Sequence, residues 1–124
     1  AKAIYWYTHD NIQYKDGASK ASYISGAYQG LHDHQGDCYT YAMTAKCLLT
    51  RAGIENMDIE RIPEGDKLHF WNLIDIGEGW YHFDTTRRAD KTTFFYWTDA
   101  QIKEYSDSHR GTHNYDPSKY PYIQ

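Results

Sequence analysis

The spacing of apolar residues changes at Gly53, and this change constrains the fold more than any other feature of the chain. Before it, Ala42, Ala45 and Leu49 recur at helical spacing, and a glycine is a common end for a helix. After it, apolar and polar residues alternate, which is typical of strands. The sequence therefore predicts a helix over residues 38–52 followed by strands that pack on it, which is an α+β fold.

Three strands are expected after this helix. The first lies around residues 57–62 and leads into a turn at 63–66. The next two cover residues 68–76 and 80–84, which are rich in aromatic and branched side chains. The Gly-Glu-Gly sequence between them is typical of a hairpin. We therefore expect an antiparallel sheet packed on the helix.

Weaker patterns flank this core. The elements expected there are a helix within residues 2–14, a turn at 16–19, a short helix near 28–31, a strand or extended segment at 94–97 and a short helix at 98–105. The tail from Ser106 is polar and rich in turn-forming residues. Because no repeat or linker is visible, residues 1–124 are expected to form a single domain. The chain does not begin with Met, so we expect it to be part of a longer protein.

Charge and hydropathy limit the classes of partner. The chain has 124 residues and a formal net charge of −4, with its basic residues dispersed, so neither nucleic acid nor an anionic membrane surface is expected to bind it. No apolar run approaches the roughly 20 residues that span a bilayer, so membrane insertion is not expected. The 13 tyrosines suit the boundary between core and water, although a face that binds peptide or carbohydrate stays open.

The two cysteines are expected to be unpaired. On one helix, Cys38 and Cys47 would lie about 13.5 Å apart along the axis and on opposite sides. A disulfide requires Cα atoms within about 7 Å. Cys47, next to two leucines, therefore reads as a small buried apolar residue, and Cys38 is left for chemistry.

Three motifs supply the parts of a nucleophilic site in a fixed order. Cys38 stands in Gly-Asp-Cys-Tyr-Thr-Tyr-Ala, His69 begins His-Phe-Trp-Asn, and Asp84 stands in Trp-Tyr-His-Phe-Asp-Thr-Thr. A free thiol has a pKa of about 8.5, which a helix N-terminus and a neighbouring imidazolium lower. We predict a catalytic triad in which Cys38 is the nucleophile, His69 the base and Asp84 the group that orients it.

The residues just before the cysteine bear on this prediction. Gly36 lets the backbone approach closely, and the free N–H groups of the first helical turn are suited to hold an oxyanion. Asp37 opposes thiolate formation by its charge unless its side chain caps the helix.

The predicted triad also depends on the register of the hairpin. A loop that pairs Ile76 with Trp80 places Asp84 on the wrong face for His69. A loop that pairs Ile76 with Gly79 sets Trp71 opposite Asp84 and leaves His69 on the same face. An even loop or a bulge is therefore required.

These motifs resemble those of the transglutaminase-like superfamily, relatives of papain-type cysteine peptidases, over residues 27–86. Phe70 stands where that family commonly has Ala, and Thr85 where it has Pro. The resemblance implies a transglutaminase-like, papain-related core and a catalytic triad of Cys38, His69 and Asp84. It extends to bacterial secreted and surface proteins, which implies an extracellular or cell-envelope location.

Other candidate residues are weaker. Tyr28 and Trp6 are candidates for the side-chain oxyanion donor that many relatives carry upstream of the cysteine. The histidines of His32-Asp33-His34, and the pair His109 and His113, have spacings compatible with a transition metal, but solvated loops are favoured. No metal and no cofactor are expected.

The sequence thus predicts thiol-dependent acyl transfer on the amide bonds of a protein or peptide, cell-wall peptide included. Water as acceptor would make the protein a cysteine peptidase or amidase, and an amine would make it transglutaminase-like; the sequence leaves this open. The alternative is a non-catalytic module that retains the fold and binds peptide or glycan. The oligomeric state is not predicted.

Overall fold

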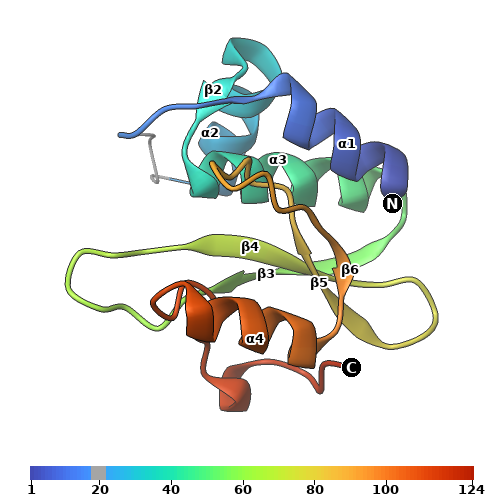
Figure 1. Ribbon diagram of the computed structural model, residues 1–124. Helices are drawn as coiled ribbons and strands as arrows, with labels where there is room; N and C mark the ends of the chain where they lie inside the picture. The colour runs from blue at the N-terminus through green and yellow to red at the C-terminus, as the bar shows by residue number, and fades with distance from the viewer. Residues whose placement is uncertain (18–21) are drawn as a thin grey trace.

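A four-stranded antiparallel sheet lies between two layers of helices and connecting segments (Figure 1). The computed structural model describes residues 1–17 and 22–124. The strands, in order across the sheet, are β3 (Glu55–Glu60), β4 (Phe70–Asp75), β5 (Trp80–Asp84) and β6 (Phe94–Trp97). One face is covered by α1 (Lys2–Asn11), α2 (Tyr23–Tyr28) and α3 (Cys38–Arg51), the other by α4 (Asp99–Ser108) and the C-terminal segment. The α+β prediction is confirmed.

Helix α3 forms where the apolar spacing predicted it. Asp37 is its N-cap, and beyond its end Gly53 takes a φ of +75°, a conformation that favours glycine. Its buried side includes Ala42, Ala45 and Leu49. The helix is therefore held against β3 and β4, with its first residue at one end of the sheet.

The shorter elements differ from the prediction. The helix expected near 28–31 begins at Tyr23, because Ser22 and Ser25 form a reciprocal capping box. It continues into the π-helical turn η1 (Gln29–Asp33). The parallel pair β1 (Gln13–Tyr14) and β2 (Gln35–Gly36) was not predicted. The expected turn at 16–19 lies partly outside the described residues.

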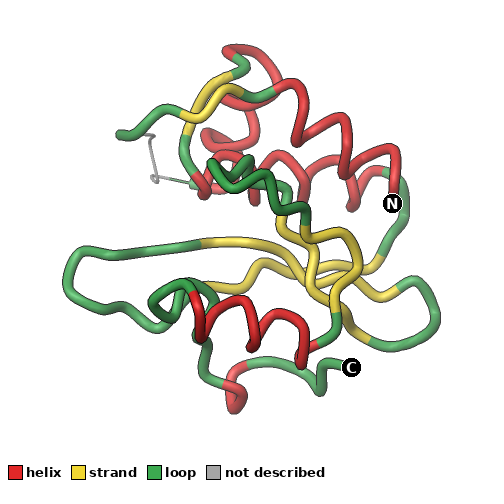
Figure 2. Tube along the Cα trace, in the orientation of Figure 1, coloured by secondary structure: helices red, strands yellow, loops and turns green. Residues whose placement is uncertain are grey.

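Each face of the sheet has its own apolar core. Figure 2 shows the loops that connect the helices and strands on the two faces. The face toward α1 and α3 buries Tyr5, Ala45, Leu49, Ile74 and Phe83. The opposite face buries Ile59, Trp71, Leu73 and Ile123. The C-terminal segment, ending after the short helix η2 (Pro117–Lys119), thus supplies a core residue. Among the described residues, no helix has the length and apolarity to cross a bilayer.

The hairpin between β4 and β5 has the register that the predicted site requires. Asp75 pairs with Trp80, which is the register that sets Ile76 opposite Gly79. The Asp75 carboxylate accepts hydrogen bonds from the N–H groups of Gly77 and Gly79 at 2.8 and 3.3 Å and closes the turn. The even loop is confirmed.

Candidate active site

Cys38 is the first residue of α3 and lines a cleft of about 710 Å³. Its exposed fraction is 7%. The Asp37 carboxylate accepts a hydrogen bond from the Tyr39 N–H at 3.1 Å, so it caps the helix as the sequence analysis required. The first N–H groups of a helix lack intrahelical acceptors and carry partial positive charge. This end of α3 therefore favours a thiolate and a developing oxyanion.

Gly36 precedes the helix in a place where only glycine fits. A Cβ built on it would collide with the Thr40 side chain. Gly36 also pairs with Tyr14 in the β1–β2 ladder. This pairing brings Tyr14 into the wall of the same cleft as Cys38.

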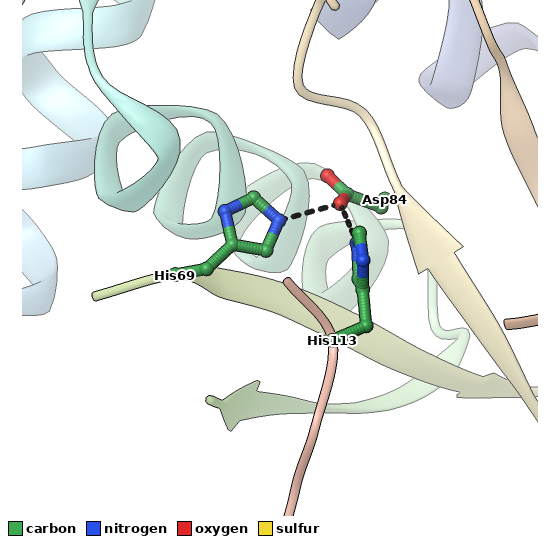
Figure 3. A group of neighbouring side chains, drawn as sticks. All are labelled: His69, Asp84 and His113. Atoms are coloured by element: carbon green, nitrogen blue, oxygen red, sulfur yellow. Dashed lines mark hydrogen bonds and ion pairs between the residues drawn. The ribbon is translucent and has the colours of Figure 1, made fainter. Parts of the chain in front are cut away.

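His69 and Asp84 form a buried hydrogen-bonded pair beside this cleft (Figure 3). Their Nε2 and Oδ2 atoms are 2.7 Å apart, and their exposed fractions are 7% and 0%. The hairpin register, continued by one position, sets Trp71 opposite Asp84 and leaves His69 on the same face. The Thr86 N–H donates to Asp84 Oδ1 at 3.0 Å and fixes the other carboxylate oxygen.

Burial and ion pairing act in opposite directions on the pKa of each partner. Burial lowers the pKa of His69, but the charge and hydrogen bond of Asp84, together with Cys38, outweigh it and raise the pKa to about 9. Burial raises the pKa of Asp84, but the charge of His69 and the hydrogen bonds from His113 and His69 hold that pKa well below its usual range. At neutral pH the pair is therefore an imidazolium and a carboxylate.

The His69 ring links the carboxylate to the thiol. Its second nitrogen points away from Asp84 (Figure 3), and its side chain also forms a hydrogen bond with Cys38. Because Nε2 is engaged by Asp84, Nδ1 is the atom left for the sulfur. The structure thus brings the three predicted residues into one connected group.

His113 contacts the same carboxylate, and sequence reasoning missed it. Its Nε2–H donates to Asp84 Oδ2 at 2.7 Å, and its exposed fraction is 2%. The interpretation of the His109 and His113 pair as a solvated loop is wrong for His113, because the segment after α4 folds back over the sheet. There its ring packs against Trp71 and Phe94. The spacing of the two histidines carried no signal of this tertiary contact.

His113 is held as a neutral imidazole. Burial is the largest influence and lowers its pKa to about 4, in spite of the hydrogen bond and charge of Asp84. Since Nε2 carries the proton that it donates to Asp84, Nδ1 accepts a hydrogen bond from the Thr112 hydroxyl at 2.9 Å. The carboxylate therefore accepts from one charged and one neutral histidine.

Trp71 packs against both histidines of this group. It is fully buried, stacks on His69 with ring centroids 5.4 Å apart, and meets His113 edge-on. Its indole N–H donates to His82 at 3.0 Å, and His82 in turn contacts Asp99. The aromatic cover lowers the local dielectric, which strengthens the ion pair.

His69, Asp84 and His113 offer two imidazole nitrogens and a carboxylate oxygen within 4.8 Å of one another. A divalent transition metal accepts such donors. However, both Nε2 atoms lie at hydrogen-bond distance from one charged oxygen, and each would have to lose its proton to bind a metal. We therefore interpret the cluster as a hydrogen-bonded one, and the expectation of no metal stays a prediction.

The cleft wall carries more positive than negative charge. Arg61, Arg87 and Arg88 line it, whereas Asp90 is the acidic residue in its lining. That carboxylate already accepts hydrogen bonds from the Tyr105 hydroxyl at 2.7 Å and the Thr92 N–H at 3.0 Å, and contacts His109 Nε2 at 3.2 Å. The hydrogen bonds from Thr92 and Tyr105, together with the charge of Arg88, lower the pKa of Asp90 to about 2, so this residue keeps its negative charge and offsets part of the positive charge of the wall.

The two residues considered as oxyanion donors do not line the cleft. Tyr28 is exposed and stacks on His32, and Trp6 packs on Tyr5 and His9. Tyr14 lies there instead. Burial raises its pKa to about 12, with the charges of Cys38, Asp16 and Asp37 and a side-chain hydrogen bond to Asp16 adding to the effect, so its hydroxyl is neutral and already donates to Asp16.

The remaining candidate residues are not part of the site. His32, Asp33 and His34 are exposed as predicted, but His32 and Asp33 lie in the helical turn η1 and not in a loop. Cys38 and Cys47 are both free thiols, as expected. Cys47 is half-buried and packs beside Ala42 and Met43.

Comparison with known proteins identifies the fold family. A family model of the transglutaminase-like superfamily matches residues 1–85, a segment that contains Cys38, His69 and Asp84 but not His113. No curated protein matches the chain.

Solved structures resemble the fold at low sequence identity. A presumed cysteine protease from Cytophaga hutchinsonii is 20% identical, with a TM-score of 0.58 over 77% of this chain and 34% of its own. A TGase is 14% identical, with a TM-score of 0.54 over 74% of this chain and 27% of its own. The chain thus spans about a third or less of these two proteins. Because the family model covers more than half of its residues, the chain belongs to the transglutaminase-like superfamily.

Proposed function

We propose that this domain carries out thiol-dependent acyl transfer on amide bonds, with Cys38 as nucleophile, His69 as acid and base, and Asp84 as the orienting carboxylate. The observation that carries the proposal is the 2.7 Å contact between His69 and Asp84 beside a cleft that Cys38 lines from a helix N-terminus. A nucleophile, a base and a group that orients the base are the parts this chemistry requires.

In the first half-reaction, the Cys38 thiolate attacks the carbonyl carbon of the amide. The C–S bond forms as the carbonyl π electrons move to oxygen, and the N-terminal N–H groups of α3 stabilise the oxyanion. The tetrahedral intermediate collapses as the C–N bond breaks, and imidazolium His69 gives its proton to the leaving amine. The products are a free amine, a thioester on Cys38 and a neutral His69.

In the second half-reaction, neutral His69 takes a proton from the acceptor as the acceptor attacks the thioester. The C–S bond breaks and the thiolate–imidazolium pair is restored. Water as acceptor gives hydrolysis, whereas a primary amine gives transamidation. The substrate we propose is a protein or peptide, cell-wall peptide included, at an extracellular or cell-envelope location.

Alkylation of Cys38 by iodoacetamide is expected to stay rapid well below pH 8 and to slow by at least tenfold at pH 6 in His69→Ala. The physical reason is that a thiolate held by an imidazolium persists at pH values where a free thiol is protonated. The rate is measured from pH 4 to 10, with the labelled cysteine located by mass spectrometry.

Cys47 is the internal control, because it is half-buried on α3 and lacks a histidine partner among the described residues. Cys38→Ala confirms which signal belongs to which thiol. Slow labelling of Cys38 with the pH dependence of a free thiol, unchanged in His69→Ala, contradicts the proposal and favours a non-catalytic module that binds peptide or glycan. Rapid labelling justifies a screen of amides with and without added primary amines.

A further inference from the structure

The segment that follows α4 reaches the proposed triad, although it lies outside the part of the chain that the family model matches. The His113 ring is wedged between Trp71 and Phe94, with centroid distances of 4.8 and 5.1 Å. Its backbone N–H donates to the Ser106 hydroxyl at 3.0 Å, and that hydroxyl donates to Asn114. The ring therefore has a fixed position and orientation.

We propose that His113 is a positioning residue of the acyl-transfer site: its neutral imidazole donates from Nε2 to Asp84 Oδ2 and holds the carboxylate that orients His69. Both histidines donate to one oxygen at 2.7 Å, and the Thr86 N–H occupies the other oxygen. The carboxylate consequently cannot rotate without losing hydrogen bonds in a fully buried place. The inference rests on the proposed function, because it assigns His113 a role through Asp84 and His69.

The charges around this group are those of Asp84, His69, Cys38 and Arg88. His69 and Arg88 both disfavour a second positive charge on His113. A neutral donor supports Asp84 and leaves the single imidazolium on His69, where the proposed chemistry requires it. An apolar residue at 113 would remove one donor and leave the carboxylate more dependent on His69.

The test compares His113→Gln, which retains an N–H donor at a similar reach, with His113→Leu, which has none. The alkylation rate of Cys38 by iodoacetamide at pH 6 is expected to remain within about threefold of wild type in His113→Gln. In His113→Leu it is expected to fall by about 10- to 100-fold, by analogy with the loss of a partner that orients a metal-bound histidine. In His113→Leu, the alkaline part of the plot of Cys38 alkylation rate against pH is also expected to move to higher pH. The reason is that Asp84 then accepts from His69 alone and stabilises its imidazolium more strongly.

If His113 only stabilises the fold, the alkylation rate of Cys38 will fall in proportion to the fraction of folded protein, and its pH dependence will keep its shape. That outcome overturns the proposal. Equal rates in both variants and wild type overturn it as well. His32→Leu, an exposed histidine, is the matched control and should match wild type.

Nitrogen NMR of labelled histidines provides a test that needs no reactive thiol. A neutral His113 with the proton on Nε2 from pH 5 to 8 supports the proposal; a charged ring or an Nδ1–H tautomer overturns it. Stoichiometric zinc in purified wild type that is lost in His113→Leu also overturns it, in favour of a metal site. If wild-type Cys38 labels as slowly as a free thiol, the proposed function fails, while the NMR result still decides whether His113 holds Asp84.

A separate observation concerns the charge of the cleft. The chain has a net charge of −4, yet Arg61, Arg87 and Arg88 line the space beside Cys38. The Arg87 guanidinium is anchored by hydrogen bonds to the carbonyl groups of His9 and Asp10 at 3.1 and 3.3 Å. Arg61 is partly neutralised by a 3.4 Å contact with Glu64, so Arg87 and Arg88 carry the argument.

Arg88 adds to this charged wall, and the neutral Thr86 lies behind it. The Arg88 guanidinium lies 5.5 Å from the centre of the Tyr105 ring, within reach of a cation–π contact. The Thr86 hydroxyl is buried at the cleft and has no hydrogen-bond partner within the described part of the chain. Two guanidinium groups on one cleft wall suit a ligand oxygen with negative charge.

We infer that the cleft selects amide substrates that carry a carboxylate close to the bond that is cleaved. The probe is the pair iodoacetate and iodoacetamide, which deliver similar groups to Cys38 with and without a negative charge. The measured quantity is the rate constant of iodoacetate at Cys38 divided by that of iodoacetamide. At low salt, this ratio is expected to fall by about 3- to 10-fold in Arg88→Gln and in Arg87→Gln. The ratio in wild type should fall as salt is added.

Arg51→Gln is the matched control, because this exposed arginine lies at the far end of α3, about 20 Å from Cys38. A rate ratio that none of the three variants changes overturns the inference, as does an equal change in all three. Both reagents react with the thiol directly, so the result is independent of whether any amide is turned over.

Discussion

Replacing Asp84 by asparagine is expected to lower kcat/KM for acyl transfer by about 10³- to 10⁴-fold, the scale of the same change in a serine-protease triad. One carboxylate oxygen accepts the Thr86 N–H and the other accepts from both His69 and His113. An asparagine has only one acceptor oxygen for these two positions. If that oxygen faces Thr86, the amide N–H₂ group faces the two histidines.

The consequence for His69 is a change of tautomer. To accept from an asparagine N–H, its Nε2 must be unprotonated, which moves the proton of the neutral ring to Nδ1. Nδ1 is the atom that faces Cys38, so the ring could no longer take the thiol proton there. The imidazolium also loses the carboxylate charge that raises its pKa to about 9. Both effects remove the proposed thiolate–imidazolium pair.

The measurement is kcat/KM on the first amide that wild-type protein turns over, together with the alkylation rate of Cys38, which needs no substrate. Asp99→Asn is the matched control, since Asp99 also contacts a buried histidine, His82, at 3.0 Å but lies outside the cleft. It is expected to alter the rate by less than threefold. A near-normal rate in Asp84→Asn, with the fold intact by circular dichroism, would remove Asp84 from the mechanism.

Local patterns were sufficient to predict the part of the fold that carries the triad. The apolar spacing of α3 and its terminal Gly53 defined the helix, because one buried face imposes a period of 3.6 residues. The hairpin was predictable from two runs of aromatic and branched residues around a Gly-Glu-Gly sequence, whereas its register was only a condition for the triad, which the structure meets. These features depend on residues close together in the sequence, or on a single turn.

Contacts between distant segments could not be predicted in the same way. His113 lies 29 residues from Asp84, and only the docking of the C-terminal segment over the sheet brings them together. Tyr14 reaches the cleft through the two-residue β1–β2 ladder, which has no periodicity to detect. Turn-forming residues predicted a polar tail, but the same residues allow that tail to fold back and bury His113 and Ile123.

The free energy of unfolding is expected to be largest near pH 6.5 and to fall on both sides, for opposite reasons at two histidines. The folded-state pKa of His69 is about 9, above the unfolded value of 6.5, so its contribution is complete below pH 6.5 and is lost as the pH rises through 9. The folded-state pKa of His113 is about 4, so below pH 6.5 the unfolded chain binds a proton that the folded protein does not. Stability therefore falls from pH 6.5 to 4.

Each shift corresponds to a change on the order of 3 kcal/mol, which is measurable by urea denaturation at a series of pH values. His113→Gln removes the titrating imidazole, so the free energy of unfolding is expected to become nearly constant between pH 5 and 6.5. In this range most carboxylates are already ionised in both the folded and the unfolded protein. The decrease in stability at alkaline pH, which is due to His69, is expected to remain. His32→Gln should leave the profile unchanged, because that histidine is exposed. The free energy of unfolding could instead fall between pH 6.5 and 5 as steeply in His113→Gln as in wild type. That result would show that His113 takes up its proton in the folded protein as readily as in the unfolded chain. In that case the neutral, donating imidazole assigned to it would be wrong, whereas loss of the slope would show that burial keeps His113 neutral in the folded protein.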